Sequence, residues 1–217
     1  MNKSILDKLN NGRQYRDINV SEFERRAADD NSERIVEGYA TVFNTEYQLF
    51  KVDNYTVNEQ IDPHAFDECD MSDVIMQYDH QGRVFARISN GTLFVGPDDV
   101  GLKMRAQLGG TEIGRQLYEE IAGGYTTKMS FGFTVAEDRI EQIEDHETGT
   151  VTVLRTITKI NKLYDVSAVS LPANDATSIS ARTYGEGVIA EVRKEIAERE
   201  ERKKRIKIIK ILAEAKK

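Results

Sequence analysis

Three residues with the chemistry of a hydrolase stand where strands or turns would hold them in place. His80 ends the apolar run VIMQYDH, Ser130 lies in the alternating segment YTTKMSFGFTV, and Asp165 interrupts the apolar stretch LYDVSAVSL. A serine becomes a nucleophile when an adjacent imidazole takes its proton, and a carboxylate bonded to the other ring nitrogen fixes the tautomer of that imidazole. The three residues therefore fit a serine, base and orienting-acid triad.

Each of these residues also has a purely structural interpretation. A histidine after Asp79 is commonly a surface or capping residue, and a strand serine is commonly exposed. An ionised carboxylate in an apolar strand needs a cationic or N–H partner. For Asp165 that partner could be His80, Lys162 or Arg155. Spacing alone leaves these alternatives open.

The sequence offers few other groups for catalysis. Besides His80, the histidines are His64 and His146. The single cysteine, Cys69, is surrounded by carboxylates in DECDMSD, which should disfavour its thiolate and argues against a cysteine protease. The neighbouring acids and histidines lack the spacing of a known metal site. We therefore expect no metal, no cofactor and no internal disulfide.

The elements that must position these residues are mainly strands. From Arg34 onward, runs rich in Val, Ile, Tyr, Phe and Thr recur roughly every 10 residues, which is typical of a β-barrel or sandwich. In 125–135 the apolar residues alternate with polar ones, so Ser130 should face a cleft or solvent. A polar segment after residue 135 predicts a long hairpin that leads into one or two further strands. The five earlier strands are predicted at 34–44, 55–61, 83–88, 91–96 and 100–108.

Two helices complete the expected α+β fold. Ile113, Leu117 and Ile121 recur every four positions and Thr111 offers an N-cap oxygen, so a helix is predicted over 112–122. The end of the chain has no Gly or Pro after Gly187 and predicts one long charged helix. We expect three parts: a flexible N-terminal lead-in with no functional site (1–33), a β-barrel domain (34–184) and an amphipathic C-terminal helix (185–217).

Charge and hydropathy exclude several classes of partner. The net charge is −7, although residues 190–217 carry 11 Lys and Arg against 6 Glu. An acidic body argues against general nucleic-acid binding, whereas the basic end could meet an acidic partner or its own body. The apolar face of IKIIKIL needs cover, either from the body or from another chain, and self-association would supply it. No apolar run is long enough for a bilayer or a signal peptide, so we expect a cytosolic protein without membrane contact.

Several segments in order resemble the prohead proteases of tailed phages. The resemblance runs from about Arg34 to Asn174, and it is carried by GYATVFN (38–44), EQIDPHAF (59–66), VIMQYDH (74–80), RVFARISNGTL (83–93), GLKMRAQL (101–108), GGYTTKMSFGF (123–133) and LYDVSAVSLPAN (163–174). Three positions depart from the family pattern. His64 stands in PHAF where the family has PGAF and is a rival base. Asp79 precedes His80 where the family has an acid after the histidine, and Asp165 replaces the usual glutamate.

The resemblance implies a serine endopeptidase of capsid maturation, with His80 and Ser130 as the catalytic pair and Asp165 as the third member. His64 and His146 are alternatives for that third place. The family is similar to herpesvirus capsid-maturation proteases, which implies a closed β-barrel with surrounding helices. The implied substrates are phage scaffold, the major capsid protein and the enzyme itself, inside the prohead assembling in the bacterial cytoplasm. The alternative is a non-catalytic structural or scaffold-associated head protein with an inactive protease fold.

Overall fold

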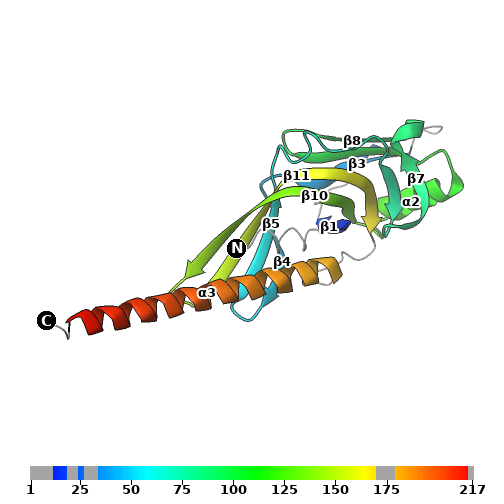
Figure 1. Ribbon diagram of the computed structural model, residues 1–217. Coiled ribbons are helices and arrows are strands. Elements are labelled where there is room, and N and C mark those ends of the chain that lie inside the picture. The colour runs from blue at the N-terminus through cyan, green and yellow to red at the C-terminus, as the bar shows by residue number, and fades with distance from the viewer. Residues whose placement is uncertain (1–11, 19–23, 27–33, 170–178, 215–217) are drawn as a thin grey trace.

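The computed structural model describes residues 12–18, 24–26, 34–169 and 179–214 (Figure 1). Within them the chain forms two sheets, two α-helices and one short 3-10 helix, η1 (Ile88–Asn90). The expectation of a mainly β, α+β fold is therefore confirmed. None of the described helices is long and apolar enough to cross a membrane.

The larger sheet is organised around one long hairpin. Strand β11 pairs antiparallel with β10 along almost its whole length, and it pairs in parallel with β5 near its start and with β6 near its end. The seven strands are β1 (Gln14–Ile18), β10 (Lys128–Asp145), β11 (Thr150–Val169), β5 (Tyr55–Ile61), β4 (Tyr47–Val52), β6 (Ile75–Tyr78) and β7 (Gln81–Arg87). The long hairpin after residue 135 is thus confirmed, whereas β1, β4 and β6 were not predicted as strands.

The smaller sheet packs against the part of the larger one that contains the start of β10. Its order is β2 (Glu24–Arg26), β3 (Ile35–Val42), β9 (Gly101–Gln107) and β8 (Leu93–Pro97). The main core lies between the sheets and includes Val36, Met104, Phe131 and Phe133. The apolar alternation predicted for β10 therefore points, as expected, into a shared core.

A closed barrel is not confirmed by the described strands. Their hydrogen bonds leave β1, β4 and β7 at the edges of the larger sheet and β2 and β8 at the edges of the smaller one. The physical reason lies in β10 and β11, which do not curl around one core. The end of β10 and the start of β11, which are nearest the hairpin turn, leave the main core and contribute to a separate apolar cluster with the C-terminal helix. Strand spacing in the sequence does not distinguish these two arrangements.

Helix α2 (Glu112–Ala122) forms as its sequence predicts. The Thr111 hydroxyl accepts a hydrogen bond from the Gly114 amide at 3.0 Å, which caps the N-terminus. Leu117 and Ile121 are buried on one face. The helix ends at Gly123 and Gly124, and Gly124 has a φ of +76° that glycine adopts at little cost.

Helix α3 (Ile179–Glu214) runs along β4 and β5 and continues past the sheets (Figure 1). Tyr184, Val188 and Val192 pack in the second apolar cluster. The helix was expected to begin at residue 185, but it begins at Ile179 and so includes Gly185 and Gly187. The helix packs so closely on Phe50 at Gly185 that a Cβ there would lie 2.5 Å from the Phe50 side chain. This close approach favours glycine inside the helix.

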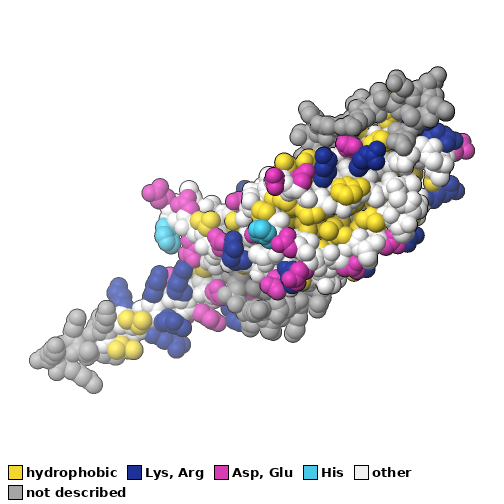
Figure 2. Space-filling view, turned by 90° about the horizontal axis from the view of Figure 1, so that it is seen from above, with side chains coloured by type: hydrophobic (Ala, Val, Ile, Leu, Met, Phe, Trp, Pro, Cys, Tyr) yellow, Lys and Arg dark blue, Asp and Glu magenta, His cyan; other side chains and the backbone are white. Residues whose placement is uncertain are grey.

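The part of α3 that extends past the sheets carries mainly charged side chains, with a few apolar ones among them (Figure 2). Ile206, Ile208 and Ile209 are about half exposed or more. The side chains beyond residue 209 lie outside the described part, and so does the rest of the apolar face expected from IKIIKIL. The division into three parts at residues 33 and 184 stays a prediction.

Candidate active site

Three neighbouring strands bring the predicted site residues to one place. Ser130 on β10 lies opposite Ser167 on β11, and Gly132 lies opposite Asp165. Strand β6 pairs with the same part of β11, where Tyr78 is the partner of Ala168. Because side chains alternate along a strand, Ser130 and Asp165 share one face of the sheet beside the end of β6.

His80 reaches that face from a tight turn between β6 and β7. Tyr78 pairs with Gln81, so Asp79 and His80 are the two residues of the hairpin loop. Both have positive φ, +48° and +56°, as a type I′ turn requires. Such turns favour Asn-Gly, and a histidine in this conformation is strained. The Asp79 amide donates to the Ala168 carbonyl at 3.0 Å, which ties the turn to β11.

The three predicted residues are in contact. His80 Nε2 lies 2.5 Å from Ser130 Oγ, and His80 Nδ1 lies 2.5 Å from Asp165 Oδ1. The Ser167 hydroxyl donates to the same carboxylate oxygen at 2.8 Å. These contacts have the connectivity of a nucleophile, a base and an acid that orients the base. The site arises from residues 50 and 85 positions apart in the chain.

Burial differs from the expectation for Ser130. Its side chain and that of Asp165 are 0% exposed, whereas Ser130 was expected to face a cleft or solvent. The predicted alternation of β10 holds, but its polar face is covered. The Tyr15 ring of β1 lies 4.3 Å from the His80 ring and forms part of this cover. The side chain of His80, 15% exposed, is the member of the three that reaches the surface.

Arg13 is a component of the site that the sequence did not reveal. It forms an ion pair with Asp165, and its guanidinium lies over the rings of Tyr15 (5.2 Å) and Tyr164 (4.6 Å). A Cβ at position 132 would lie 2.5 Å from Asp165 Oδ2 and 2.9 Å from Arg13 Nε. Glycine at 132 therefore leaves the space in which the arginine and the carboxylate meet.

A buried ionic cluster fixes strand β1, and therefore Arg13, in register. Glu59 accepts hydrogen bonds from Arg16, Arg155 and, at 2.5 Å, from the Tyr47 hydroxyl. Burial alone would raise the pKa of Glu59, but the charges of Arg16 and Arg155 lower that pKa to about 2. The carboxylate is thus ionised at neutral pH. Removing one member would leave an unpaired charge in the interior, so β1 is held firmly.

The surroundings of His80 keep its imidazole neutral. Burial lowers the pKa of His80, and the positive charge of Arg13 lowers it further, to about 4, although Asp79 acts in the opposite direction. Burial penalises the charged ring, and the guanidinium repels it. A neutral imidazole has a free lone pair on one nitrogen, so at neutral pH His80 is in the form that can accept a proton.

The competing candidates lie elsewhere. His64 is largely exposed, with Nδ1 3.1 Å from Asp67 Oδ2. His146 is exposed in the turn between β10 and β11. Burial raises the pKa of the Cys69 thiol to about 11, so the thiol is protonated at neutral pH.

The two alternative partners of Asp165 are engaged with other groups. Lys162 donates to Asp70 at 2.6 Å. Arg155 pairs with Glu59 and Asp138. The partners of Asp165 that the structure describes are His80, Ser167 and Arg13.

Comparison with known proteins adds one match. A family model described as Caudovirus prohead serine protease matches residues 21–188. That range is more than half of the 217 residues and includes His80, Ser130 and Asp165, whereas Arg13 precedes it. Neither the curated proteins nor the solved structures gave a match.

Proposed function

The chain belongs to the Caudovirus prohead serine protease family, and on this premise we propose that it is an active serine endopeptidase of phage capsid maturation. The observation that carries the proposal is the contact of His80 with both Ser130 and Asp165, each at 2.5 Å. A serine bonded to a neutral imidazole is the arrangement that nucleophilic catalysis requires.

In the proposed reaction, His80 Nε2 takes the Ser130 hydroxyl proton as Oγ forms a bond to the carbonyl carbon of a peptide. The tetrahedral intermediate then collapses, the C–N bond breaks, and His80 returns the proton to the leaving amine. The acyl group stays on Ser130. Water enters, His80 removes a proton from it, and hydrolysis releases the second product and restores the serine.

Asp165 and Arg13 have supporting roles in this proposal. Asp165 accepts the Nδ1 hydrogen of His80, so Nε2 faces the serine with its lone pair, and the carboxylate stabilises the imidazolium that forms during attack. Arg13 holds the carboxylate from its other oxygen. It also opposes protonation of His80 in the resting enzyme, which keeps the base in its reactive form.

Family membership favours substrates within the phage head. We infer that the enzyme cleaves scaffold protein or the scaffold-like part of the capsid protein, and also itself, inside the prohead assembling in the host cytoplasm. The exposed isoleucines and basic residues near the end of α3 suit a contact with scaffold or shell that would carry the protease into the particle.

The test is cleavage of purified scaffold protein by the full chain and by Ser130→Ala. Loss of the nucleophile should lower the cleavage rate about a thousandfold or more without changing the thermal unfolding midpoint greatly. A matched control is Thr134→Val, which alters a hydroxyl on the same strand whose oxygen has no partner within the described residues. Normal cleavage by Ser130→Ala would refute the assignment of the nucleophile.

A further inference from the structure

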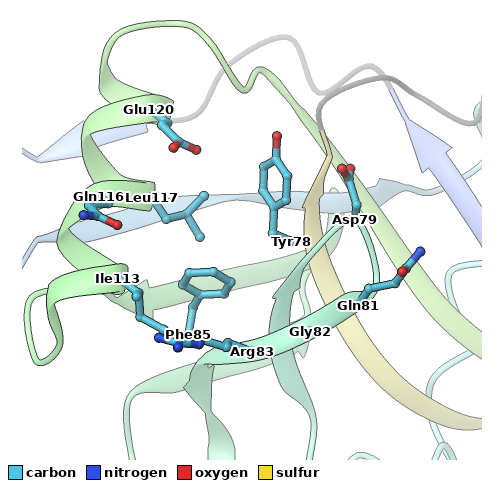
Figure 3. A pocket seen from close by; sticks show the side chains of 10 residues that line it. All are labelled: Tyr78, Asp79, Gln81, Gly82, Arg83, Phe85, Ile113, Gln116, Leu117 and Glu120. Atoms are coloured by element: carbon cyan, nitrogen blue, oxygen red, sulfur yellow. The ribbon is translucent and has the colours of Figure 1, made fainter.

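A hollow of about 640 Å³ opens beside the turn that carries His80 (Figure 3). One wall is the β6–β7 hairpin and the other is helix α2. Phe85 from the hairpin and Leu117 from the helix point toward each other across it, with Tyr78 beside them. Its volume lies within the range of about 300–1,000 Å³ that is usual for ligand pockets.

We propose that this hollow binds a large apolar side chain of the substrate peptide, next to the bond that is cleaved. The inference rests on the proposed function, because it places the occupant by reference to Ser130 and His80. It adds a substrate class, peptides with Leu, Met, Phe or Tyr near the scissile bond, that membership of the family does not specify.

The walls suit an apolar occupant. Tyr78, Phe85 and Ile113 are only partly buried although they line a concavity, and Leu117 lies at its base. An apolar occupant would remove these side chains from water, and this burial of apolar surface would stabilise the complex.

Charges at the rim do not favour a charged side chain of either sign. Glu120 on α2 and Asp79 in the turn carry negative charge, whereas Arg83 on β7 carries positive charge. A basic or an acidic side chain would meet attraction and repulsion together. Discrimination is therefore left to the apolar walls.

Continuity with the catalytic residues identifies the occupant as substrate. Tyr78 and Asp79 precede His80 in one hairpin, and Gln81 follows it. The proposed base and one wall of the hollow therefore belong to the same turn. An extended peptide advances about 3.5 Å per residue. His80 is where the buried site reaches the surface, and the residues on either side of it line the hollow, so the proposal places there a side chain one or two positions from the scissile carbonyl.

The experiment uses the full chain and a synthetic peptide library with randomised positions, with cleavage sites read by mass spectrometry. For the wild type, one position near the scissile bond should be enriched about 10-fold or more in Leu, Met, Phe or Tyr, the discrimination an apolar pocket can supply. Ile113→Trp narrows the hollow and should shift that position to Ala, Ser or Gly. Ile113→Ala widens it and should shift the position toward Phe and Trp.

Damage to the fold would not shift the substrate preference in opposite directions in the two Ile113 variants. Glu112→Trp is the matched control, since it adds the same ring to the same turn of α2 at an exposed residue that does not line the hollow. It should cleave with wild-type preference. Labelling of Ser130 by a fluorophosphonate, which needs no peptide side chain, measures the triad separately and should be equal in all four proteins.

Three results would overturn the proposal. Equal labelling and equal cleavage with no change of preference in either Ile113 variant would refute the pocket and leave the protease assignment standing. A wild type that neither labels nor cleaves would refute the proposed function and this inference with it. Dimerisation that Ile113→Trp abolishes while preference stays unchanged would instead assign the hollow to a second copy of the chain.

Discussion

The half of the β10–β11 hairpin that carries Ser130 is buried on both faces, whereas in the half beyond Glu137 β10 alternates between half-buried and exposed residues and β11 has buried residues at every second position from Val151 to Arg155. Register shifts between Gly132 and Asp138 separate the two halves. Such bulges bend a strand and redirect its side chains. The first half packs against the smaller sheet, and the second half contributes, with β4 and β5, to a platform for α3.

The two halves differ in how polar groups are used. In the catalytic half, Ser130, Asp165 and Ser167 are fully buried and bonded to one another or to His80. In the platform half, Glu144 is partly exposed and pairs with Arg199 of α3, although Arg155 there belongs to the buried ionic cluster around Glu59. Buried polar networks fix geometry strictly, and exposed pairs contribute little. Changes in the first half should therefore alter chemistry, and changes in the second should alter only stability.

Asp165→Asn is the sharpest test of that division. The amide would keep the shape of the site but favour the wrong imidazole tautomer, so kcat should fall by about 10⁴-fold, as for other triads. The measurement is steady-state cleavage of scaffold peptide. Asp138→Asn on the same hairpin is the control, since this carboxylate pairs with Arg155 and should affect unfolding rather than kcat. Comparable losses of kcat in both variants would break the comparison.

Gly132→Ala should have the next largest effect. The new Cβ would lie 2.5 Å from Asp165 Oδ2, so the carboxylate and Arg13 must shift, and a displacement of this kind costs activity about 10²-fold. The control is Gly149→Ala in the platform half, where φ is +69° but no backbone or catalytic group is close. That variant should lose about 1 kcal/mol of stability and keep its activity. Full activity of Gly132→Ala would show that the close approach is dispensable.

Arg13→Gln should change the pH dependence of catalysis more than its maximum. Catalysis needs neutral His80, so activity is lost as pH falls through the pKa of His80, which is about 4 in the native protein. Loss of the guanidinium removes a charge that opposes protonation. The acid limb of kcat/KM should therefore move to higher pH, toward the ordinary histidine value of 6.5.

Arg13→Lys keeps the charge and is the matched variant, so its acid limb should stay near that of the wild type. A pH–rate profile for the three proteins decides the matter. An unchanged profile in Arg13→Gln would mean that Arg13 serves only to anchor β1.

The sequence analysis named the three residues that meet in the half with Ser130, but it did not predict what surrounds them. Alternation placed Ser130 on the polar face of β10, and family resemblance connected it with His80 and Asp165. The cover over that face could not be foreseen, because Arg13 and Tyr15 lie in a polar segment without strand periodicity. The turn at Asp79 and His80 was also hidden, since Asp is usual at the first position of a type I′ turn but histidine stands where glycine is usual.

The platform half shows the opposite balance. Polar alternation after residue 135 predicted the hairpin, and the charged C-terminal segment predicted a helix. Neither pattern showed that the two would pack together, because the contact depends on the close fit of Gly185 to Phe50. The closed barrel was expected from the strand spacing and from the similarity of the family to herpesvirus capsid-maturation proteases. Strand spacing predicts the number of strands and does not determine which edges meet.

Arg199→Met should have the smallest effect. Arg199 donates to both carboxylate oxygens of Glu144, at 2.9 and 2.6 Å, and both side chains are partly exposed. Such a pair contributes about 0–1 kcal/mol and is screened by salt. Denaturant unfolding of the wild type, Arg199→Met, Glu144→Gln and the double variant should give a small coupling that vanishes in 1 M salt, with cleavage rates unchanged. A fall in kcat on breaking this distant pair would show that α3 and the proposed active site are mechanically linked, because the hairpin and β1 each contact both.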